Sequence, residues 1–278
     1  MHALPFVVAL AVAAILAPAL LRGLREAAHT RTNYRDRALP FPFGVLSLAA
    51  ALLALIPLTL LARLASTGVF QRPLLPIAVY ALGILALGLI DDTLAGDEQR
   101  LRARGWRGHG SAVLRGELTT GTLKAAGSLG LALLATSYLE LLNGRWLLAT
   151  GVLVLATNVF NLLDLRPGRA TKAFVLLGAG LTIGSADLRP LWALGLFAGP
   201  ALVAGAYDLR ERAMLGDTGA NLLGALAGLW LVLTLSTTGQ LIALALLVVV
   251  TVYGEFRSIS ALIERTPGLR HLDALGRP

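Results

Sequence analysis

Three clusters of acidic and amide side chains stand out in a chain that is otherwise short of charge. Asp91 and Asp92 are adjacent, Asn161 and Asp164 close one long apolar stretch, and Asp217 opens another. Mg²⁺ is typically held by one or two carboxylates together with substrate phosphates and several waters. If folding brings these clusters together, they predict a magnesium-assisted phosphoryl transfer.

The carboxylates also have plainer interpretations. Asp91 and Asp92 could be a solvated pair at a membrane boundary. Against this, acids at the C-terminal end of a helix are unfavourable by about 0.3–1 kcal/mol, so the pair is expected to need a cation or a basic partner. Asp217, taken alone, is typical of a helix N-cap, where an acid is favourable.

The amide cluster and two isolated basic groups leave similar alternatives open. Asn158, Asn161 and Asp164 are spaced i, i+3 and i+6 and lie roughly along one helix face, where they could serve a site or only a contact between helices. Lys124, one turn inside an apolar stretch, could snorkel to the interface or meet a phosphate as a point charge. His271 stands alone in the tail, where a single histidine is more often inert than catalytic.

The composition indicates the elements that must position these groups. Of 278 residues, 56% are hydrophobic and 14% are charged, and the mean hydropathy is +0.74. Soluble domains are about 45–50% apolar and about 25% charged. These values exclude a disordered chain, a coiled coil and a soluble nucleic-acid-binding domain. The absence of cysteine excludes disulfides and thiolate metal sites.

The sequence predicts an all-α polytopic membrane protein with about nine transmembrane helices. Each apolar stretch approaches the roughly 20 residues needed to cross a bilayer. The whole chain, 1–278, forms one domain, because no loop is long enough for an independent core. The predicted spans are residues 3–21, 44–62, 74–90, 119–139, 146–163, 171–186, 191–207, 218–236 and 241–254.

Loop charges predict the orientation. Of the 24 Lys and Arg residues, 20 fall on the side of the loops that carry the acidic clusters, and four fall on the other. By the positive-inside rule, the N-terminus is outside and the C-terminus is cytoplasmic. The first stretch has no basic residue before it, which favours an uncleaved span. In the tail, 255–278, Phe256, Ile259 and Ile263 recur at helical spacing and predict an interfacial helix.

At these motifs the chain resembles the polyprenyl-phosphate N-acetylhexosamine-1-phosphate transferases. That superfamily includes phospho-MurNAc-pentapeptide translocase and the bacterial GlcNAc-1-phosphate transferases. The resemblance covers most of the chain; each match alone is weak, but five in order are fairly specific. The matching segments are Asn33-Tyr34-Arg35 with Pro40 and Gly44, Gly88 to Asp92, Leu118 to Lys124, Asn158 to Asp164, and Gly216-Asp217-Thr218-Gly219.

The resemblance implies an activity and roles for individual residues. Family members transfer a sugar-1-phosphate from a UDP-sugar to a polyprenyl phosphate and release UMP. By resemblance, Asp217 would bind Mg²⁺ (or Mn²⁺) with Asp92 beside it. Asp91 would assist or deprotonate the lipid phosphate with support from Asp92. The implied substrate-binding residues are Lys124, Asn158, Asn161, Asp164, Arg166, Asp208 and His271.

The same resemblance implies partners and a location. The partners would be a nucleotide-sugar donor, a polyprenyl phosphate lipid and the membrane, with no nucleic acid, and a homodimer is left open. The location would be a bacterial-type plasma membrane, with the active site facing the cytoplasm. The process would be cell-envelope glycan synthesis.

Departures from the family pattern argue against the peptidoglycan translocase itself. Pro167 replaces the signature's second aspartate, although Arg166 and Arg169 offer another anion grip. A three-histidine cluster is reduced to His271, Asp208 stands about where a base-binding Asn is expected, and no tenth span follows. A divergent donor, or a catalytically degenerate member that binds lipid phosphate or an envelope-assembly partner, therefore stays open. A small-solute transporter ranks last, because the span centres contain almost no charge.

Overall fold

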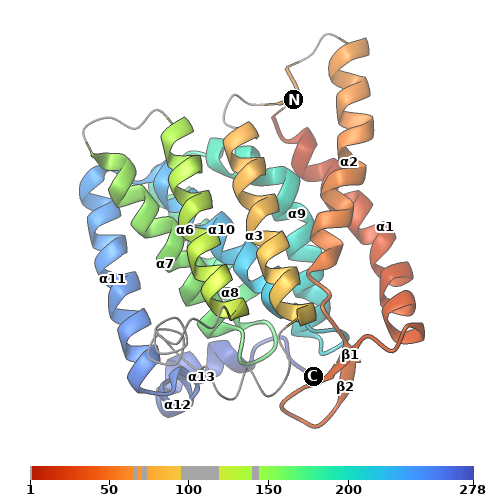
Figure 1. Cartoon of the computed structure of the whole chain (residues 1–278), viewed down its shortest axis with the longest axis vertical. Coiled ribbons are helices and arrows are strands. Elements are labelled where there is room, and N and C mark those ends of the chain that lie inside the picture. The colour runs from red at the N-terminus through yellow and green to blue at the C-terminus, as the bar shows by residue number, and fades with distance from the viewer. Residues whose placement is uncertain (1, 66–67, 71–73, 95–118, 140–143) are drawn as a thin grey trace.

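The computed structural model describes residues 2–65, 68–70, 74–94, 119–139 and 144–278. Most of the predicted loop 91–118 lies outside these ranges, as does Leu118 of the third matching segment. Within them the chain is nearly all-α, as predicted, with one short hairpin as the exception (Figure 1).

Helices of 17 to 23 residues form a bundle, and each overlaps one of the predicted apolar stretches. They are α1 (Leu4–Glu26), α2 (Val45–Leu64), α3 (Leu74–Leu94), α6 (Thr120–Tyr138), α7 (Arg145–Leu163), α8 (Arg169–Ser185), α9 (Arg189–Leu209), α10 (Gly216–Thr234) and α11 (Thr237–Phe256).

In the described part of the chain, seven helices are long and apolar enough to cross a membrane. They are the helices of the bundle other than α6 and α8. The α8 helix has only 17 residues, and α6 carries Lys124 in its first two turns. The seven helices indicate a multi-pass membrane protein, whereas the count of nine spans and the orientation stay predictions.

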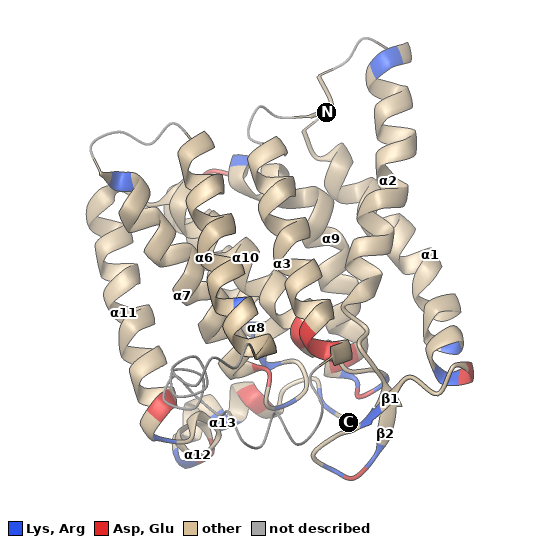
Figure 2. Cartoon of the chain, viewed as in Figure 1, with Lys and Arg blue, Asp and Glu red and all other residues tan. Residues whose placement is uncertain are grey.

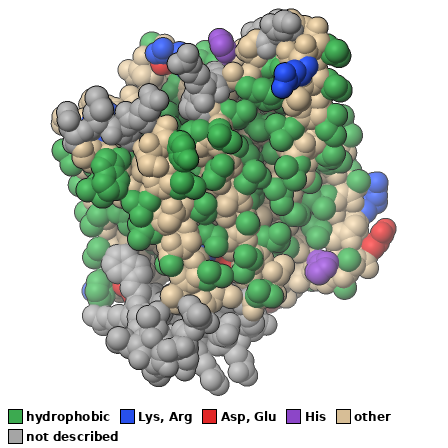
Figure 3. All heavy atoms as spheres, turned by 45° about the horizontal axis from the view of Figure 1, so that its top comes forward, with side chains coloured by type: hydrophobic (Ala, Val, Ile, Leu, Met, Phe, Trp, Pro, Cys, Tyr) green, Lys and Arg blue, Asp and Glu red, His purple; other side chains and the backbone are tan. Residues whose placement is uncertain are grey.

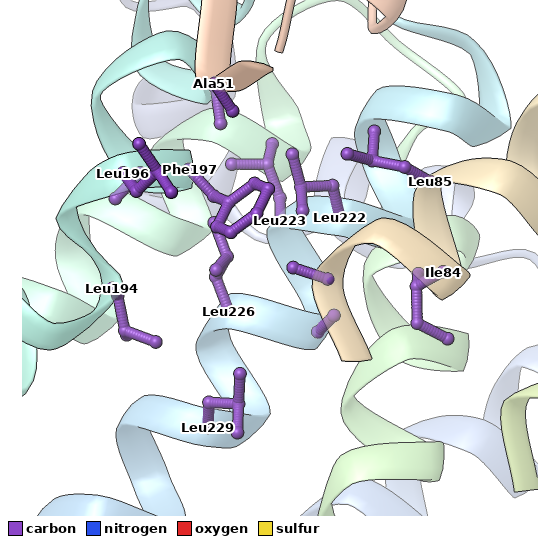
Figure 4. Close-up of a cluster of buried hydrophobic side chains, with 14 of the residues drawn as sticks. Ala51, Ile84, Leu85, Leu194, Leu196, Phe197, Leu222, Leu223, Leu226 and Leu229 are labelled. Atoms are coloured by element: carbon purple, nitrogen blue, oxygen red, sulfur yellow. The ribbon is translucent and has the colours of Figure 1, made fainter. Parts of the chain in front are cut away.

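The centre of the bundle is α10, which packs against α3, α7, α8 and α9. Of its most apolar 18 residues 89% are buried, compared with 17% in α11. Because α10 touches protein on all sides, its position relative to its neighbours is strongly constrained. Figure 4 shows part of this core, where Leu222, Leu223 and Leu226 of α10 lie near Phe197 of α9 and Leu85 of α3.

The outer surface is apolar. Large hydrophobic side chains are exposed on several helices, including Ile15 on α1, Leu64 on α2, Ile183 on α8 and Val249 on α11. Hydrophobic side chains also cover much of the face seen in Figure 3. A soluble protein rarely exposes apolar patches of this extent, so the surface fits a lipid environment.

Charged residues gather at one end of the bundle, which we call the polar end (Figure 2). The chain leaves α1 there to form β1 (Thr30–Thr32) and β2 (Ala38–Pro40), and α12 (Ile259–Arg265) and α13 (Pro267–Ala274) lie there too (Figure 1). The polar end is the side that the loop charges predict to be cytoplasmic.

The antiparallel β1–β2 hairpin was not predicted from the sequence. The Asn33 side chain accepts hydrogen bonds from the backbone N–H groups of Arg35 and Arg37, at 2.9 and 3.0 Å, and so closes the turn. At the end of β2, the carbonyl of Pro40 accepts a hydrogen bond from Met214 N–H at 2.9 Å. The hairpin is therefore hydrogen-bonded to the segment that precedes α10.

The predicted helix in the tail is present only in part, because Phe256 ends α11 and the residues after it form two helices, α12 and α13. The break falls at Thr266, because the following Pro267 disfavours helical geometry in the residue before it. Ile259 is buried, while Phe256 is exposed. An interfacial position for this tail stays a prediction.

Candidate active site

The C-terminal end of α3 meets the N-terminal end of α10 through Asp92. One carboxylate oxygen of Asp92 accepts a hydrogen bond from the backbone N–H of Asp217 at 3.0 Å. The other accepts from the N–H and the hydroxyl of Thr218, at 2.8 and 2.6 Å. The first N–H groups of a helix lack partners within the helix, and a negative charge there is favourable. Asp92 therefore caps α10 from a different helix.

Two glycines make this close approach possible. A Cβ on Gly88, one turn before Asp92 on the same helix face, would lie 2.6 Å from the carbonyl oxygen of Asp217. Gly216 begins α10 with φ +70°, and a Cβ there would lie 2.5 Å from an Asp92 carboxylate oxygen. The positive φ and the lack of space both favour glycine at this position.

Side chains from three other helices lie close to the carboxylate of Asp217. One of its oxygens forms an ion pair with Lys124 Nζ of α6. The Asn161 amide of α7, oriented so that both its atoms are satisfied, donates to the other oxygen at 3.2 Å and accepts from Lys124 Nζ at 2.7 Å. The carboxyl group of Asp91, on α3, lies within interaction distance of Asp217 and of the Thr120 hydroxyl. The structure thus brings together Asp91, Lys124, Asn161 and Asp217.

Asp164 lies at the edge of this group, directly after α7. Burial raises the pKa of the Asp164 carboxyl well above its usual range. The nearby charges of Asp208 and Asp217 raise this pKa further, while Lys124 lowers it. The carboxylates at the end of α7, the end of α9 and the beginning of α10 therefore influence one another at the polar end.

Asp208 lies nearby, and its carboxylate binds backbone N–H groups. It is 4% exposed, and its carboxylate accepts bonds from the N–H groups of Gly168 and Leu215, at 2.7 and 3.3 Å. It thereby ties the segment after α7 to the turn before α10. Asn158 donates to the Thr251 hydroxyl of α11 at 3.3 Å.

Arg166 and His271 lie outside the carboxylate cluster. The Arg166 guanidinium pairs with Glu264 of α12 at 2.7 Å and lies 4.5 Å from the ring centroid of Tyr34. His271 is exposed on α13, and no hydrogen bond or ion pair within the described ranges connects it to Asp217. Arg169 pairs with Asp273 at 2.7 Å and is therefore also engaged with the tail.

Two cavities flank the cluster. The larger, of about 370 Å³, lies between α6, α7 and α10 and is bordered by Gly121, Lys124, Ala125, Ser128, Val154, Leu155, Thr157, Asn158, Asn161 and Asn221. The smaller, of about 40 Å³, is bordered by Asn33, Tyr34, Asp164, Leu165, Arg166, Pro167, Asp208 and Met214. Both contain residues that the sequence proposed for substrate binding.

The donor set fits a magnesium ion that is shared with a substrate. Within the described ranges, no group of three or more His, Asp or Glu side chains could hold a metal ion on its own. Asp91 and Asp217, however, place two carboxylates side by side. Mg²⁺ commonly takes one or two carboxylates and completes its octahedron with substrate phosphates and water. Both oxygens of Asp92 already accept bonds from α10, so Asp92 supports Asp217 in place.

The sequence interpretation missed the roles of two residues. The Thr218 hydroxyl donates to Asp92, although the sequence alone gave it only a place in a motif. Asn221, 1% exposed, borders the larger cavity one turn after Asp217. A polar residue within an apolar helix is a signal that could have singled it out.

No protein-family model matches the chain, and no curated protein matches its sequence. What the chain does must therefore be inferred from its own residues. Their strongest feature is the convergence of four helices, α3, α6, α7 and α10, around the carboxylate of Asp217.

Proposed function

We propose that this protein transfers a sugar-1-phosphate from a UDP-sugar to a polyprenyl phosphate and releases UMP. The observation that carries the proposal is the grouping of Asp91, Lys124 and Asn161 around Asp217 at the polar end. The loop charges favour a cytoplasmic position for this end, in a bacterial-type plasma membrane. There a soluble nucleotide sugar and a membrane lipid could meet.

In the proposed reaction, an oxygen of the lipid phosphate attacks the phosphorus that bears the sugar. The bond from this phosphorus to the bridging oxygen breaks, and that oxygen leaves with UMP. Asp91 accepts the proton of the lipid phosphate. The Lys124 ammonium group offsets the negative charge that accumulates on the phosphoryl oxygens. Asn161 contacts both Lys124 and Asp217 and so holds their relative positions.

Asp217, with Asp91 beside it, would hold Mg²⁺. The ion would neutralise phosphate charge and orient the two phosphates. Asp92 acts as a positioning residue, because it caps α10 and thereby fixes Asp217. Asp164, which borders the smaller cavity, would contact the nucleotide.

A direct assay measures UMP release by the purified chain in lipid nanodiscs with Mg²⁺, polyprenyl phosphate and a panel of nucleotide sugars that includes UDP-GlcNAc and UDP-MurNAc-pentapeptide. Asp217→Asn is expected to lower the rate by at least about 100-fold, because it weakens both the metal site and the Lys124 ion pair. Asp187→Asn is the matched control. Asp187 is partly exposed, pairs with Arg189 at the start of α9, and should leave the rate unchanged.

Two results would contradict this proposal. No UMP release with any donor of the panel would exclude the transfer. Equal rates for Asp217→Asn and Asp187→Asn would show that release does not depend on the cluster at Asp217.

The second candidate is a non-catalytic protein that binds lipid phosphate or an envelope-assembly partner. The sequence suggested that Arg166 and Arg169 bind an anionic donor. In the structure they form ion pairs with Glu264 and Asp273 of the tail. Under this alternative, Asp217→Asn would preserve the cell phenotype while metal binding is lost. The transferase requires both to be lost together.

A further inference from the structure

The cavity between α6, α7 and α10 extends deeper into the bundle than the carboxylate cluster. Asn221 follows Asp217 by four residues on α10, so the two side chains share one face, one turn apart. The same spacing relates Lys124 to Ser128 on α6. Both α6 residues and Asn221 border the cavity. Polar groups thus line it to at least one turn beyond Asp217.

Asn221 is unusual among these residues. It is 1% exposed, and neither its amide nitrogen nor its amide oxygen has a hydrogen-bond partner in the part of the chain that the structure describes. Burying an amide without a partner costs free energy, and folded proteins rarely keep such a group. Because Asn221 borders the cavity, a group bound there could supply the missing partner.

The residues around the cavity indicate the chemistry of that group. They include one cation, Lys124, which also pairs with Asp217, together with amides and hydroxyls, but no carboxylate. This set favours an anion that accepts hydrogen bonds. Val154 and Leu155 of α7 provide an apolar part of the same wall. An anion attached to a hydrocarbon chain would match both parts.

We infer that Asn221 binds the phosphate head of the polyprenyl phosphate acceptor, donating a hydrogen bond from Nδ2 to a phosphate oxygen. Asn221 then sets the depth of the head group, one turn further into the bundle than Asp217. The inference rests on the proposed function for its choice of lipid. It adds a binding residue that the sequence motifs do not include.

Asn221→Leu tests this role, because leucine has a similar volume and no hydrogen-bonding group. The measurement is the affinity of polyprenyl phosphate for the full chain in nanodiscs, compared with the affinity of the UDP-sugar. We expect the lipid affinity to fall about 10-fold or more, the loss typical of a hydrogen bond to a charged group, and the donor affinity to stay constant. The thermal midpoint of the ligand-free variant should be equal or higher, since an unpartnered amide has been removed.

Thr234→Val is the matched control. Thr234 lies at the far end of α10, and its hydroxyl has no partner among the described residues. The exchange to valine should leave the lipid affinity unchanged. Inorganic phosphate and uncharged polyprenol serve as further probes, since the first should compete weakly and the second should bind much less well than the phosphorylated lipid.

Several outcomes would overturn the inference. Equal lipid affinity of Asn221→Leu and the parent chain would do so, as would equal binding of polyprenol and polyprenyl phosphate. A lower midpoint with unchanged affinity would assign Asn221 to a buried water. Binding of inorganic phosphate without any binding of the lipid would place the anion elsewhere.

The two proposals fail in distinguishable ways. Lipid binding that depends on Asn221, without UMP release from any donor, would contradict the transferase and leave this inference standing. UMP release with an unchanged lipid affinity and KM in Asn221→Leu would contradict only the inference.

Discussion

Gly88→Ala is the most direct test of how the site is held together. A Cβ at this position would lie 2.6 Å from the carbonyl oxygen of Asp217 and 2.7 Å from the backbone N and Cα of Thr218. These are backbone atoms at the start of a buried helix, so they cannot rotate away. An ordinary contact of about 3.5 Å requires α3 and α10 to separate by roughly 0.9 Å.

Such a separation would also break the cap on α10. The hydrogen bond from Thr218 N–H to Asp92 measures 2.8 Å. A separation of the helices by roughly 0.9 Å would lengthen it beyond the normal hydrogen-bond range. Overpacking costs about 1–3 kcal/mol, and the weakened bonds to a carboxylate about 1.5–3 kcal/mol. The higher helix propensity of alanine returns up to about 1 kcal/mol. We therefore expect a net loss of about 2–4 kcal/mol.

The assay is the thermal midpoint in detergent, with UMP release measured in parallel. Gly130→Ala, on α6, is the matched control, because a Cβ there meets nothing within 4 Å. It should be neutral or slightly stabilising. Gly83→Ala, on α3, should fall between the two, since its Cβ would meet only the side-chain end of Leu131. Equal midpoints for the Gly88 and Gly130 variants would refute the close-approach argument.

Three further changes probe the surroundings of the site. Asp208→Asn should lower the free energy of unfolding by about 1–3 kcal/mol, because one of its two buried backbone N–H groups loses its acceptor. A chemical unfolding series in detergent measures this change, and an unchanged midpoint would contradict the prediction. Although burial raises it, hydrogen bonds from Arg169 and Arg277 lower the pKa of Asp273 to about 2. The pKa of Asp in the unfolded chain is about 3.9, so the docking of α13 should be stable above that pH and should weaken as the pH falls towards 2. Hydrogen exchange in α13 measures this loss. Asp273→Asn should show faster exchange already at neutral pH. Glu264→Gln should change the thermal midpoint very little, because exposed ion pairs contribute about 0–1 kcal/mol, and a large drop would show that its pair is structural.

The positions of the helices could be predicted from the sequence, because each overlaps an apolar stretch, although α6 and α8 are not among the helices long and apolar enough to cross a membrane. The ends of the helices could not be predicted. The α3 helix continues to Leu94 through Asp91 and Asp92, four residues beyond the predicted end, because α10 satisfies the Asp92 carboxylate. The β1–β2 hairpin was missed, since it is stabilised by the Asn33 turn and by pairing with a distant segment.

The candidate site could be predicted only as a set of residues on one side of the membrane. Alternating spans bring the ends of α3, α7 and α10 to the same end of the bundle, so the acids were expected there. Which atoms meet depends on contacts between residues about a hundred positions apart, such as Lys124 with Asp217. For the same reason, the sequence could not show that Asp208 binds the backbone N–H groups of Gly168 and Leu215, and its assignment to a substrate stays a prediction.

The cost expected for two acids at the end of α3 explains why these helices meet as they do. The C-terminal end of a helix carries partial negative charge, and an N-terminal end carries partial positive charge. In this structure the end of α3 lies against the beginning of α10, with the Asp92 carboxylate between them. Asp92 is thus stabilised by the protein itself, while its role as a metal ligand stays a prediction. At Asp91 and Asp217, Lys124 supplies one positive charge, and under the proposed function a magnesium ion bound with substrate phosphates would supply the rest.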